Sequence, residues 1–228
     1  RLLLKNVENM PGSIDRVADV GCGAGATTFM LRDMLMGVKG GESIIDGYDV
    51  HPNVHNFSET DSVRFYEGDF CVIAKYIYDM VVLFDVIEHI PNPIDFLKGA
   101  SKNAKMIALH ISLDDSILCW LRNHPRKKLS HPGHLLILDM PAALNLLTLS
   151  GLRIIDFEYS PGFRSPSGQA TILSKVIKPI RELIFKISPY LTQKLLAGVS
   201  VTVLALTPYG LKEKYKDYDT KQKFYSSE

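Results

Sequence analysis

Three aspartates stand at or near the ends of three apolar segments in the first third of the chain, where carboxylates could bind a polar ligand. Asp19 lies in VADVGCGAG (residues 17–25), Asp49 in GYDVHP (47–52) and Asp69 in EGDF (67–70). Short apolar segments of this kind are typical of strands. Ligands of open α/β sheets bind at the carboxyl ends of parallel strands. The sequence therefore predicts that the three carboxylates meet at one edge of a sheet and form a ligand site there.

A G-x-G-x-G turn, formed by Gly21, Gly23 and Gly25, separates the first strand from a helix. Glycines let a ligand approach the backbone closely, and the helix N-terminus offers free N–H groups. The dinucleotide fingerprint is G-x-G-x-x-G, and Ala26 stands where its third glycine, or the alanine that some sequences allow, would fall. Asp19 favours a ligand with a cationic group over one that offers only a pyrophosphate. The alternative is a structural turn that binds nothing.

Asp49 and Asp69 have the positions expected of nucleoside-binding acids. Asp49 lies about twenty-four residues beyond Gly25, near the spacing at which an acidic residue binds ribose hydroxyls. A carboxylate accepts two hydroxyl protons at once, although a strand-end aspartate can also simply cap the next turn. Asp69 can accept a hydrogen bond from an exocyclic amine, and Phe70 can cover a base. Alone, however, Gly68 and Asp69 are a common turn dipeptide.

A fourth motif follows the longest apolar run, residues 78–84. Asp85 ends that strand, and Glu88 and His89 follow in FDVIEHIPNP (84–93). In order, VADVGCGAG, GYDVHP, EGDF and YDMVVLFDVIEHIPNP resemble class I S-adenosylmethionine-dependent methyltransferases, particularly the small-molecule group with EHI or EHL after the fourth strand. The resemblance covers residues 17–112 strongly and continues weakly to residue 206.

The resemblance implies S-adenosylmethionine as cofactor, with S-adenosylhomocysteine as product. The glycine turn with Asp19 would line the methionine part, Asp49 would hold the ribose hydroxyls, and Asp69 would read the adenine. Phe84 and Asp85 would flank the sulfonium and its methionine tail. The full set expected to contact the cofactor is Asp19, Gly21, Cys22, Gly23, Gly25, Asp49, Val50, Asp69, Phe70, Phe84 and Asp85.

Histidines are the candidates for a catalytic base. Methyl transfer needs the nucleophile and the methyl group held in line in a site with little water, and a hydroxyl acceptor also needs a base. His131 and His134 stand out in SHPGHLLIL (130–138), and His89 is a further candidate that the family motif places mainly in a structural role. The alternative is that His131 caps a turn and His134 packs at a helix start. We expect the others to be structural: His51, His55, His110 and His124.

Two other chemistries have less support in the sequence. Asp85, Asp114 and Asp115 could supply oxygen ligands to magnesium, but the pattern around them differs from that of catechol-type methyltransferases. No His/Cys cluster indicates zinc, so we expect no metal site. A nicotinamide-dependent dehydrogenase would share a similar fold. The glycine spacing and the Gly68–Asp69 step argue against it.

The elements that position these residues alternate between strand and helix. We expect strands at residues 16–20, 43–50, 63–66, 78–84, 105–112, 152–159 and 199–206, and helices at 27–36, 91–104 and 141–150. This alternation predicts βαβ units and a parallel sheet. With the resemblance, it predicts an α/β, Rossmann-like fold: a seven-stranded, mostly parallel sheet with helices on both faces and a C-terminal antiparallel hairpin. We expect one methyltransferase domain over residues 1–211, a helical insertion or lid at about 160–198, and a charged tail at 212–228.

The insertion contains an amphipathic segment, residues 172–187, that Pro179 would kink or split. We expect it to dock on the protein as a lid, to form an oligomer contact, or to lie on an anionic membrane surface. A basic loop at residues 122–128 could attract an acidic substrate. The apolar face is Ile172, Leu173, Val176, Ile177, Ile180, Leu183, Ile184 and Ile187, and the basic residues opposite are Lys175, Lys178, Arg181 and Lys186.

Composition and net charge limit the classes of function that fit this chain. The 228 residues carry 26 Lys and Arg against 25 Asp and Glu, which leaves no whole-chain electrostatic footprint for nucleic acid. Three cysteines in no pair spacing predict reduced thiols, and neither a signal peptide nor a membrane span is recognisable, so we expect a cytoplasmic protein. The sequence thus predicts a methyltransferase acting on a small molecule, at an oxygen of a sugar, lipid-linked or quinone-like precursor. The alternatives are an RNA or protein methyltransferase, and a non-enzymatic methyltransferase-like domain acting through its amphipathic segment.

Overall fold

The computed structural model describes residues 2–9, 13–39, 43–52, 54, 59–131, 133–164 and 172–213. Of the predicted features, His55 and most of the charged tail, residues 214–228, lie outside this part. The first half of the chain contains α1 (Leu2–Asn9), β1 (Arg16–Val20), α2 (Ala26–Lys39), β2 (Ile44–Asp49), β3 (Val63–Glu67), α3 (Phe70–Ile73), β4 (Tyr78–Phe84), the 3-10 helix η2 (Ile87–His89), α4 (Pro93–Ala100) and the 3-10 helix η3 (Ser101–Asn103). The second half contains β5 (Ala104–Leu113), α5 (Ile117–Leu121), α6 (His124–Ser130), α7 (Met140–Leu149), β6 (Arg153–Ser160), the 3-10 helix η4 (Gly162–Arg164), α8 (Ile172–Ile187), α9 (Pro189–Leu196), β7 (Val199–Leu206) and α10 (Pro208–Glu213).

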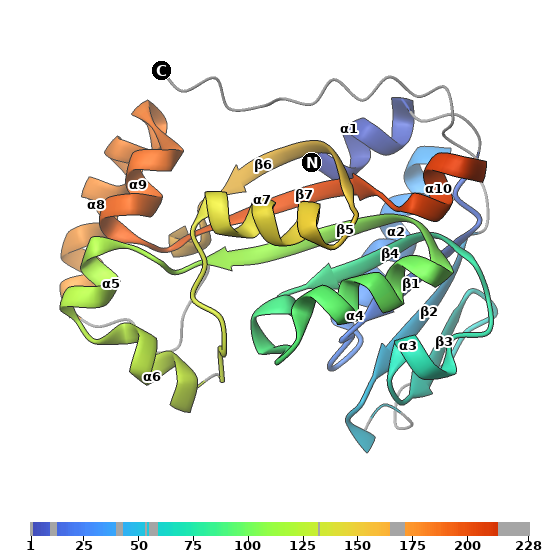
Figure 1. Cartoon of the computed structure of the whole chain (residues 1–228). Coiled ribbons are helices and arrows are strands. Elements are labelled where there is room, and N and C mark those ends of the chain that lie inside the picture. The colour runs from blue at the N-terminus through green and yellow to red at the C-terminus, as the bar shows by residue number, and fades with distance from the viewer. Residues whose placement is uncertain are drawn as a thin grey trace.

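The seven strands form one sheet in the order β3-β2-β1-β4-β5-β7-β6 (Figure 1). Strands β1 to β5 pair in parallel, and β7 pairs antiparallel with both β5 and β6. The chain runs outward from β1 to β3, then returns to place β4 on the other side of β1. The carboxyl ends of β1 and β4 therefore flank a topological switch point, where α/β sheets bind ligands. The predicted fold class is confirmed.

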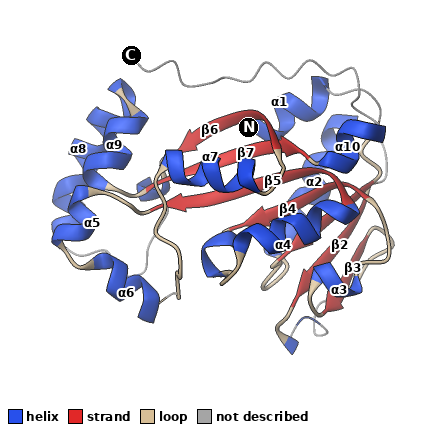
Figure 2. Ribbon diagram, in the orientation of Figure 1, coloured by secondary structure: helices blue, strands red, loops and turns tan. Residues whose placement is uncertain are grey.

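Alternation along the central strands divides the core between the two faces of the sheet. Val81 and Leu83 of β4 pack into one cluster with α4 and α7, whereas Met80 and Val82 pack into a second cluster with α1 and α2. Successive strand residues point to opposite faces, so a strand covered by helices on both sides is apolar throughout. Figure 2 shows this arrangement, with α4 and α7 on the near face and α2 behind the sheet.

Several helices differ from the sequence prediction. The short helices α3, α5 and α10 were not predicted, and most of the expected basic loop at 122–128 lies in α6. The helix expected at 91–104 is shorter, because the Asn92 side chain accepts a hydrogen bond from the Asp95 nitrogen and caps α4, which then ends at Ala100 before η3. Helix α1 was not predicted. Pro179 lies inside α8, which remains one helix over Ile172–Ile187 instead of splitting in two.

Candidate active site

The glycine turn after β1 adopts a backbone that other residues rarely take. Gly21, Gly23 and Gly25 have φ angles of 75°, 53° and 77°, in the left-handed region. The Gly21 nitrogen donates to the Tyr48 oxygen at 2.7 Å, which ties the turn to β2. A Cβ atom added to Gly21 would lie 2.5 Å from Cγ2 of Val86, so the turn packs closely against the segment after β4. A Cβ added to Gly23, by contrast, would meet no atom within 4 Å.

Asp49 lies directly beside this turn. Its Oδ2 accepts the Gly23 N–H at 2.8 Å, and its Oδ1 accepts the His51 N–H at 2.9 Å. The carboxylate therefore caps the turn after β2 and also lies beside the glycine turn. Each carboxylate oxygen has two lone pairs, so both oxygens can still accept a hydroxyl proton. Val50, which follows, is exposed.

Asp19 lies beneath the turn and is only 1% exposed. Its Oδ2 accepts the Thr28 hydroxyl at 2.7 Å, which joins the end of β1 to the first turn of α2. Burial, with a smaller contribution from the charge of Asp49, raises the pKa of Asp19 to about 6, although the Thr28 hydrogen bond opposes this. Burial and the same two carboxylates raise the pKa of Cys22 to about 12, so this thiol stays protonated and unreactive.

Asp69 is also close to Asp49 along the edge of the sheet. The Gly68 nitrogen donates to the Asp49 oxygen at 2.8 Å, and Oδ1 of the exposed Asp69 accepts the Cys71 N–H at 2.8 Å as the cap of α3. Phe70 requires a correction. We expected its ring to cover a base, but the ring is 2% exposed and packs in the core, against Tyr48 at 5.1 Å between centroids.

A histidine–aspartate pair that the sequence did not reveal lies at the ends of β4 and β5. Nδ1 of His110 is 2.8 Å from Oδ1 of Asp85, and the Asp85 N–H donates to the His110 oxygen at 3.1 Å. Asp85 has a φ of 55°, an uncommon conformation for a non-glycine residue that is often found at functional sites. The sequence predicts a structural role for His110, which stands in β5. Only the register of β5 against β4 brings it to Asp85.

His110 belongs to a row of side chains that crosses four strands. Phe84 pairs with His110, His110 with Thr202, and Thr202 with Glu158. Residues paired on neighbouring strands point to the same face of a sheet. Phe84, Thr202 and Glu158 also line a cavity of about 260 Å³ on that face. The apolar side chains that complete its lining include Leu2, Leu3, Met30, Leu31, Met34 and Tyr159. His110 therefore lies in the row that borders a mainly apolar cavity.

The three histidines proposed from sequence lie outside the strands, with His89 in η2, His131 at the end of α6 and His134 in the segment that follows. His134 is 7% exposed, and its Nδ1 is 3.1 Å from Oδ2 of Asp114. His89 packs edge-on against His134, at 4.9 Å between ring centroids, with its Nδ1 3.1 Å from the Gly133 oxygen. His131 is exposed at the end of α6. The contacts of His89 with Gly133 and His134 thus hold residues 133–138 against η2.

Glu88, between these elements, is a buried carboxylate. Its backbone oxygen accepts the Leu135 and Leu136 N–H groups at 2.8 and 3.2 Å. Neither side-chain oxygen has a hydrogen-bond partner among the described residues. Burial raises the pKa of Glu88, although the nearby His134 and His89 act in the opposite direction.

The three carboxylates considered for magnesium each have another partner. Asp85 is bound to His110, Asp115 accepts the indole N–H of Trp120 at 2.5 Å, and Oδ2 of Asp114 lies 2.5 Å from Nζ of Lys128. Burial would raise the pKa of Asp114, but its bonds to His134 and Lys128 hold that pKa below the ordinary value. Within the described ranges, no group of three or more His, Cys, Asp or Glu side chains is placed to hold a metal ion.

Comparison with known proteins places the fold. No protein-family model matches the chain, and neither does any curated protein. Solved structures do match. One is the complex of the Haloferax volcanii Trm112 methyltransferase activator with a putative methyltransferase (17% identity, 90% of this chain and 87% of that one, TM-score 0.58). Another is a putative methyltransferase of Bacillus halodurans (15%, 91% and 98%, TM-score 0.59).

A third match is the N-methyltransferase NodS of Bradyrhizobium japonicum in complex with S-adenosylhomocysteine. It is 13% identical, with 91% of this chain and 85% of that one covered and a TM-score of 0.52. Sequence identities this low show that these proteins share the arrangement of helices and strands, and they do not show a shared activity. The chain therefore has the Rossmann-like fold of class I S-adenosylmethionine-dependent methyltransferases.

Proposed function

We propose that this chain is an S-adenosylmethionine-dependent methyltransferase that methylates an oxygen of a small-molecule acceptor. The observation that carries the proposal is the meeting of Asp49 with the left-handed glycine turn, through the 2.8 Å contact to the Gly23 nitrogen. This contact lies beside the switch point of a sheet with the methyltransferase fold. The bound S-adenosylhomocysteine of NodS, on the same fold, supports the choice of cofactor.

The residues at this edge suit the chemical groups of the cofactor. The exposed oxygens of Asp49 would accept the two ribose hydroxyls. Asp69 would accept the adenine amine, while Phe70 would contribute only backbone. Asp19, beneath the turn, would supply negative charge to the ammonium and sulfonium cations. Gly23, with open space where a Cβ would stand, leaves room for the methionine part. When bound, the cofactor supplies an activated methyl group and leaves as a neutral thioether.

We assign the role of base to His110. Because a carboxylate can only accept, the contact to Asp85 makes Nδ1 of His110 the protonated nitrogen and leaves the lone pair on Nε2. Nε2 would take the proton of the acceptor hydroxyl as the oxygen forms its bond to the methyl carbon. The bound cofactor would balance this transfer, since the electron pair of its carbon–sulfur bond would remain on sulfur. His134, held by Asp114 and next to His89, is the second candidate, and His131 a third.

The acceptor would enter the cavity beside Phe84. Its lining is largely apolar, with Glu158, Ser160 and Thr202 as polar groups. This favours the lipid-linked or quinone-like members of the predicted acceptor class over a free sugar, because a sugar needs polar partners for its hydroxyls. We keep the cytoplasm as the proposed location. The free cysteines Cys22, Cys71 and Cys119 are compatible with a reducing compartment.

Label transfer separates this function from its alternatives. The purified chain is incubated with methyl-labelled S-adenosylmethionine and a cell extract, and the label is followed into organic-soluble, RNA and protein fractions. We expect label in nuclease- and protease-resistant, organic-soluble material. Label in the RNA or protein fraction would contradict a small-molecule acceptor and would indicate an RNA or protein methyltransferase. Binding of S-adenosylhomocysteine without any transfer would favour the non-enzymatic domain.

A further inference from the structure

Four helices gather at one end of the molecule, beyond the carboxyl end of β5 (Figure 1). We call α5, α6, α8 and α9 the helical cap. Within it, α8 packs on α9, α9 on α5, and α5 on α6. The cap thus joins the predicted insertion at 160–198, which contains α8 and α9, to the predicted basic loop at 122–128, most of which lies in α6. Two features that the sequence presents separately become one surface.

The apolar stripe of α8 points outward. Val176, Ile180, Leu183 and Ile187 are all exposed, Ile187 by 75%. The inward side carries Arg181, whose Nε and Nη2 donate to the Leu196 oxygen at 3.2 and 2.6 Å, together with the half-buried Ile177 and Ile184. The expectation that the apolar face docks as a lid is therefore corrected for these four residues. The side chains of Ile172, Leu173 and Lys175 lie outside the described part.

The neighbouring helices extend this apolar surface. The exposed side chains on α9 are Tyr190, Leu191 and Leu195, and those on α5 are Ile117, Trp120 and Leu121. Together with α8 they form a contiguous group of helices whose large apolar residues face solvent. An apolar surface of this extent, bordered by polar residues, marks an interaction site.

Charge on the helical cap is almost entirely positive. Residues 117–130 and 172–196 contain nine Lys and Arg and a single acid, Glu182, which is paired with Arg164 at 2.6 Å. The rest of the chain has seventeen Lys and Arg against twenty-four Asp and Glu. Two of the nine are paired with acids outside the cap, Lys128 with Asp114 and Lys194 with Asp139. The near-neutral total nevertheless hides a basic end on an acidic body.

A small basic cavity lies inside the cap. Its volume is about 140 Å³, and Arg122, Lys128 and Arg181 line it together with Asp114 and the apolar Leu118. Burial lowers the pKa of Arg181, and the nearby positive charge of Arg122 lowers it further. Asp114 is already bound to Lys128 and His134, so its charge does not offset the charges of Arg122 and Arg181. The guanidinium groups of these two arginines therefore repel each other. An anionic oxygen group would relieve this repulsion and accept from both.

We propose that the helical cap is the surface with which the protein lies on an anionic phospholipid bilayer. The apolar side chains of α5, α8 and α9 would enter the acyl boundary, and the basic residues would meet the headgroup phosphates. Within the described residues no helix is long and apolar enough to cross a membrane, so the contact is peripheral. A second copy fits less well, because a two-fold dimer through this face would set the two basic ends against each other.

The sole tryptophan of the chain, Trp120, lies on α5 and is 61% exposed, so its emission reports on the cap alone. We expect a blue shift and co-sedimentation with vesicles of phosphatidylcholine and phosphatidylglycerol, and at least about tenfold weaker binding to phosphatidylcholine alone. Equal binding to both vesicles, or no binding to either, would overturn the proposal. So would a blue shift that depends on protein concentration without lipid, because that result indicates a second copy.

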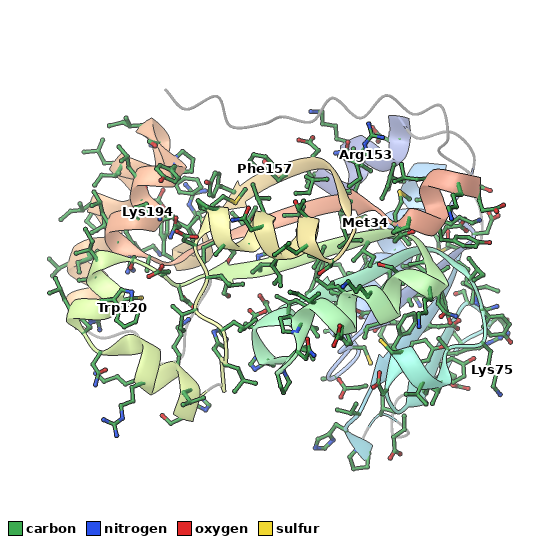
Figure 3. The ribbon with its side chains drawn as sticks, viewed as in Figure 1. Met34, Lys75, Trp120, Arg153, Phe157 and Lys194 are labelled. Carbon is green, nitrogen blue, oxygen red and sulfur yellow. The ribbon has the colours of Figure 1, made fainter. Side chains whose placement is uncertain are left out.

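Matched variants test both components of the surface. Lys178→Glu with Lys186→Glu reverses two exposed charges on α8, and Leu183→Ser with Ile187→Ser removes two exposed apolar groups without changing charge. Each pair should weaken vesicle binding about tenfold or more. The control is Lys75→Glu with Lys98→Glu, two exposed lysines outside the cap; Figure 3 shows Lys75 at the opposite end of the molecule from Trp120.

The control variant should bind anionic vesicles nearly as the unmodified chain does, and an equal loss in the control would contradict a role specific to the cap. Far-UV circular dichroism confirms that each variant is folded. Vesicle binding is measured without cofactor. A chain that does not bind vesicles would therefore contradict only the membrane proposal. A chain that does not transfer methyl groups would contradict only the proposed function.

Discussion

The backbone nitrogen of Gly23 lies 2.8 Å from Oδ2 of Asp49, and this contact joins the turn after β1 to the end of β2. It places a left-handed glycine, with open space around it, beside a carboxylate with spare lone pairs. The two residues stand twenty-six positions apart in the sequence, and parallel pairing of β1 with β2 brings them together. The cofactor assignment depends on this geometry.

Two glycine substitutions should separate folding from binding. Gly23→Ala places a Cβ in open space, so the protein should fold with a loss of about 1–2 kcal/mol for the left-handed backbone, yet bind S-adenosylhomocysteine at least about tenfold more weakly. Gly21→Ala should destabilise the fold more, since its Cβ would lie 2.5 Å from Val86. Thermal unfolding and calorimetry measure the two effects. Unchanged affinity in Gly23→Ala would contradict the placement of the methionine part.

Asp19 should make binding depend on pH. Its pKa is about 6 in the folded chain, above the value of 3.8 for a free side chain. A bound cation favours the ionised carboxylate, so binding should become tighter as the pH rises from about 5 to 7. Asp19→Asn should abolish this dependence. A pH-independent affinity in the unmodified chain would show that no cationic group lies near Asp19.

The same group should affect stability in the opposite direction. Between pH 3.8 and about 6 the folded chain holds the Asp19 proton and the unfolded chain does not. The contribution of Asp19 to the free energy of unfolding therefore falls as pH rises through this window, by roughly 3 kcal/mol in all. Urea denaturation of the unmodified chain and Asp19→Asn at pH 4 and pH 7 isolates this term. A contribution that increased with pH would mean that Asp19 is stabilised as the carboxylate.

His110 should matter for turnover and not for cofactor binding. His110→Gln should lower the rate of label transfer about 10²- to 10⁴-fold, the usual contribution of a general base, while affinity for S-adenosylhomocysteine stays within about threefold. Asp85→Asn should lower the rate less. His134→Gln is the matched comparison, because His134 is likewise paired with an aspartate, Asp114. If His134→Gln removes the activity and His110→Gln does not, the base is His134.

Phe70 tests the corrected role of an aromatic residue. Because its ring is buried against Tyr48 and Tyr78, Phe70→Leu should destabilise the fold by about 1–2 kcal/mol and leave the affinity for S-adenosylhomocysteine within about threefold. Chemical denaturation and calorimetry give the two values. A large loss of affinity with unchanged stability would instead indicate a ring that stacks on the adenine.

The sequence predicts the sheet well because β4 and β7 are buried on both faces and therefore apolar throughout. It predicts the cofactor edge because the glycine turn and Asp49 carry their own local signals. Helix α1 was missed, since its eight residues gain their burial from distant partners, such as the contact of Asn6 with Asp156 at 3.3 Å.

Two further features depend on tertiary contacts that periodicity cannot supply. The spacing of α8 predicts an apolar stripe but not its direction. The hydrogen bonds of Arg181 to the Leu196 oxygen turn this residue inward, and Val176, Ile180, Leu183 and Ile187 are left exposed. His110 carries no motif, and the register of β5 with β4 alone sets it beside Asp85. Contacts that depend on the register between strands cannot be predicted from the sequence pattern alone.

Isothermal titration calorimetry of the purified chain with S-adenosylhomocysteine tests the central claim most directly, with NAD as the competing ligand and Asp49→Ala as the variant. We predict saturable binding of S-adenosylhomocysteine in the micromolar range, no binding of NAD, and at least about tenfold weaker binding in Asp49→Ala, because a ribose diol loses its bidentate acceptor. No binding of S-adenosylhomocysteine at millimolar concentration, or preferential binding of NAD, would contradict the account.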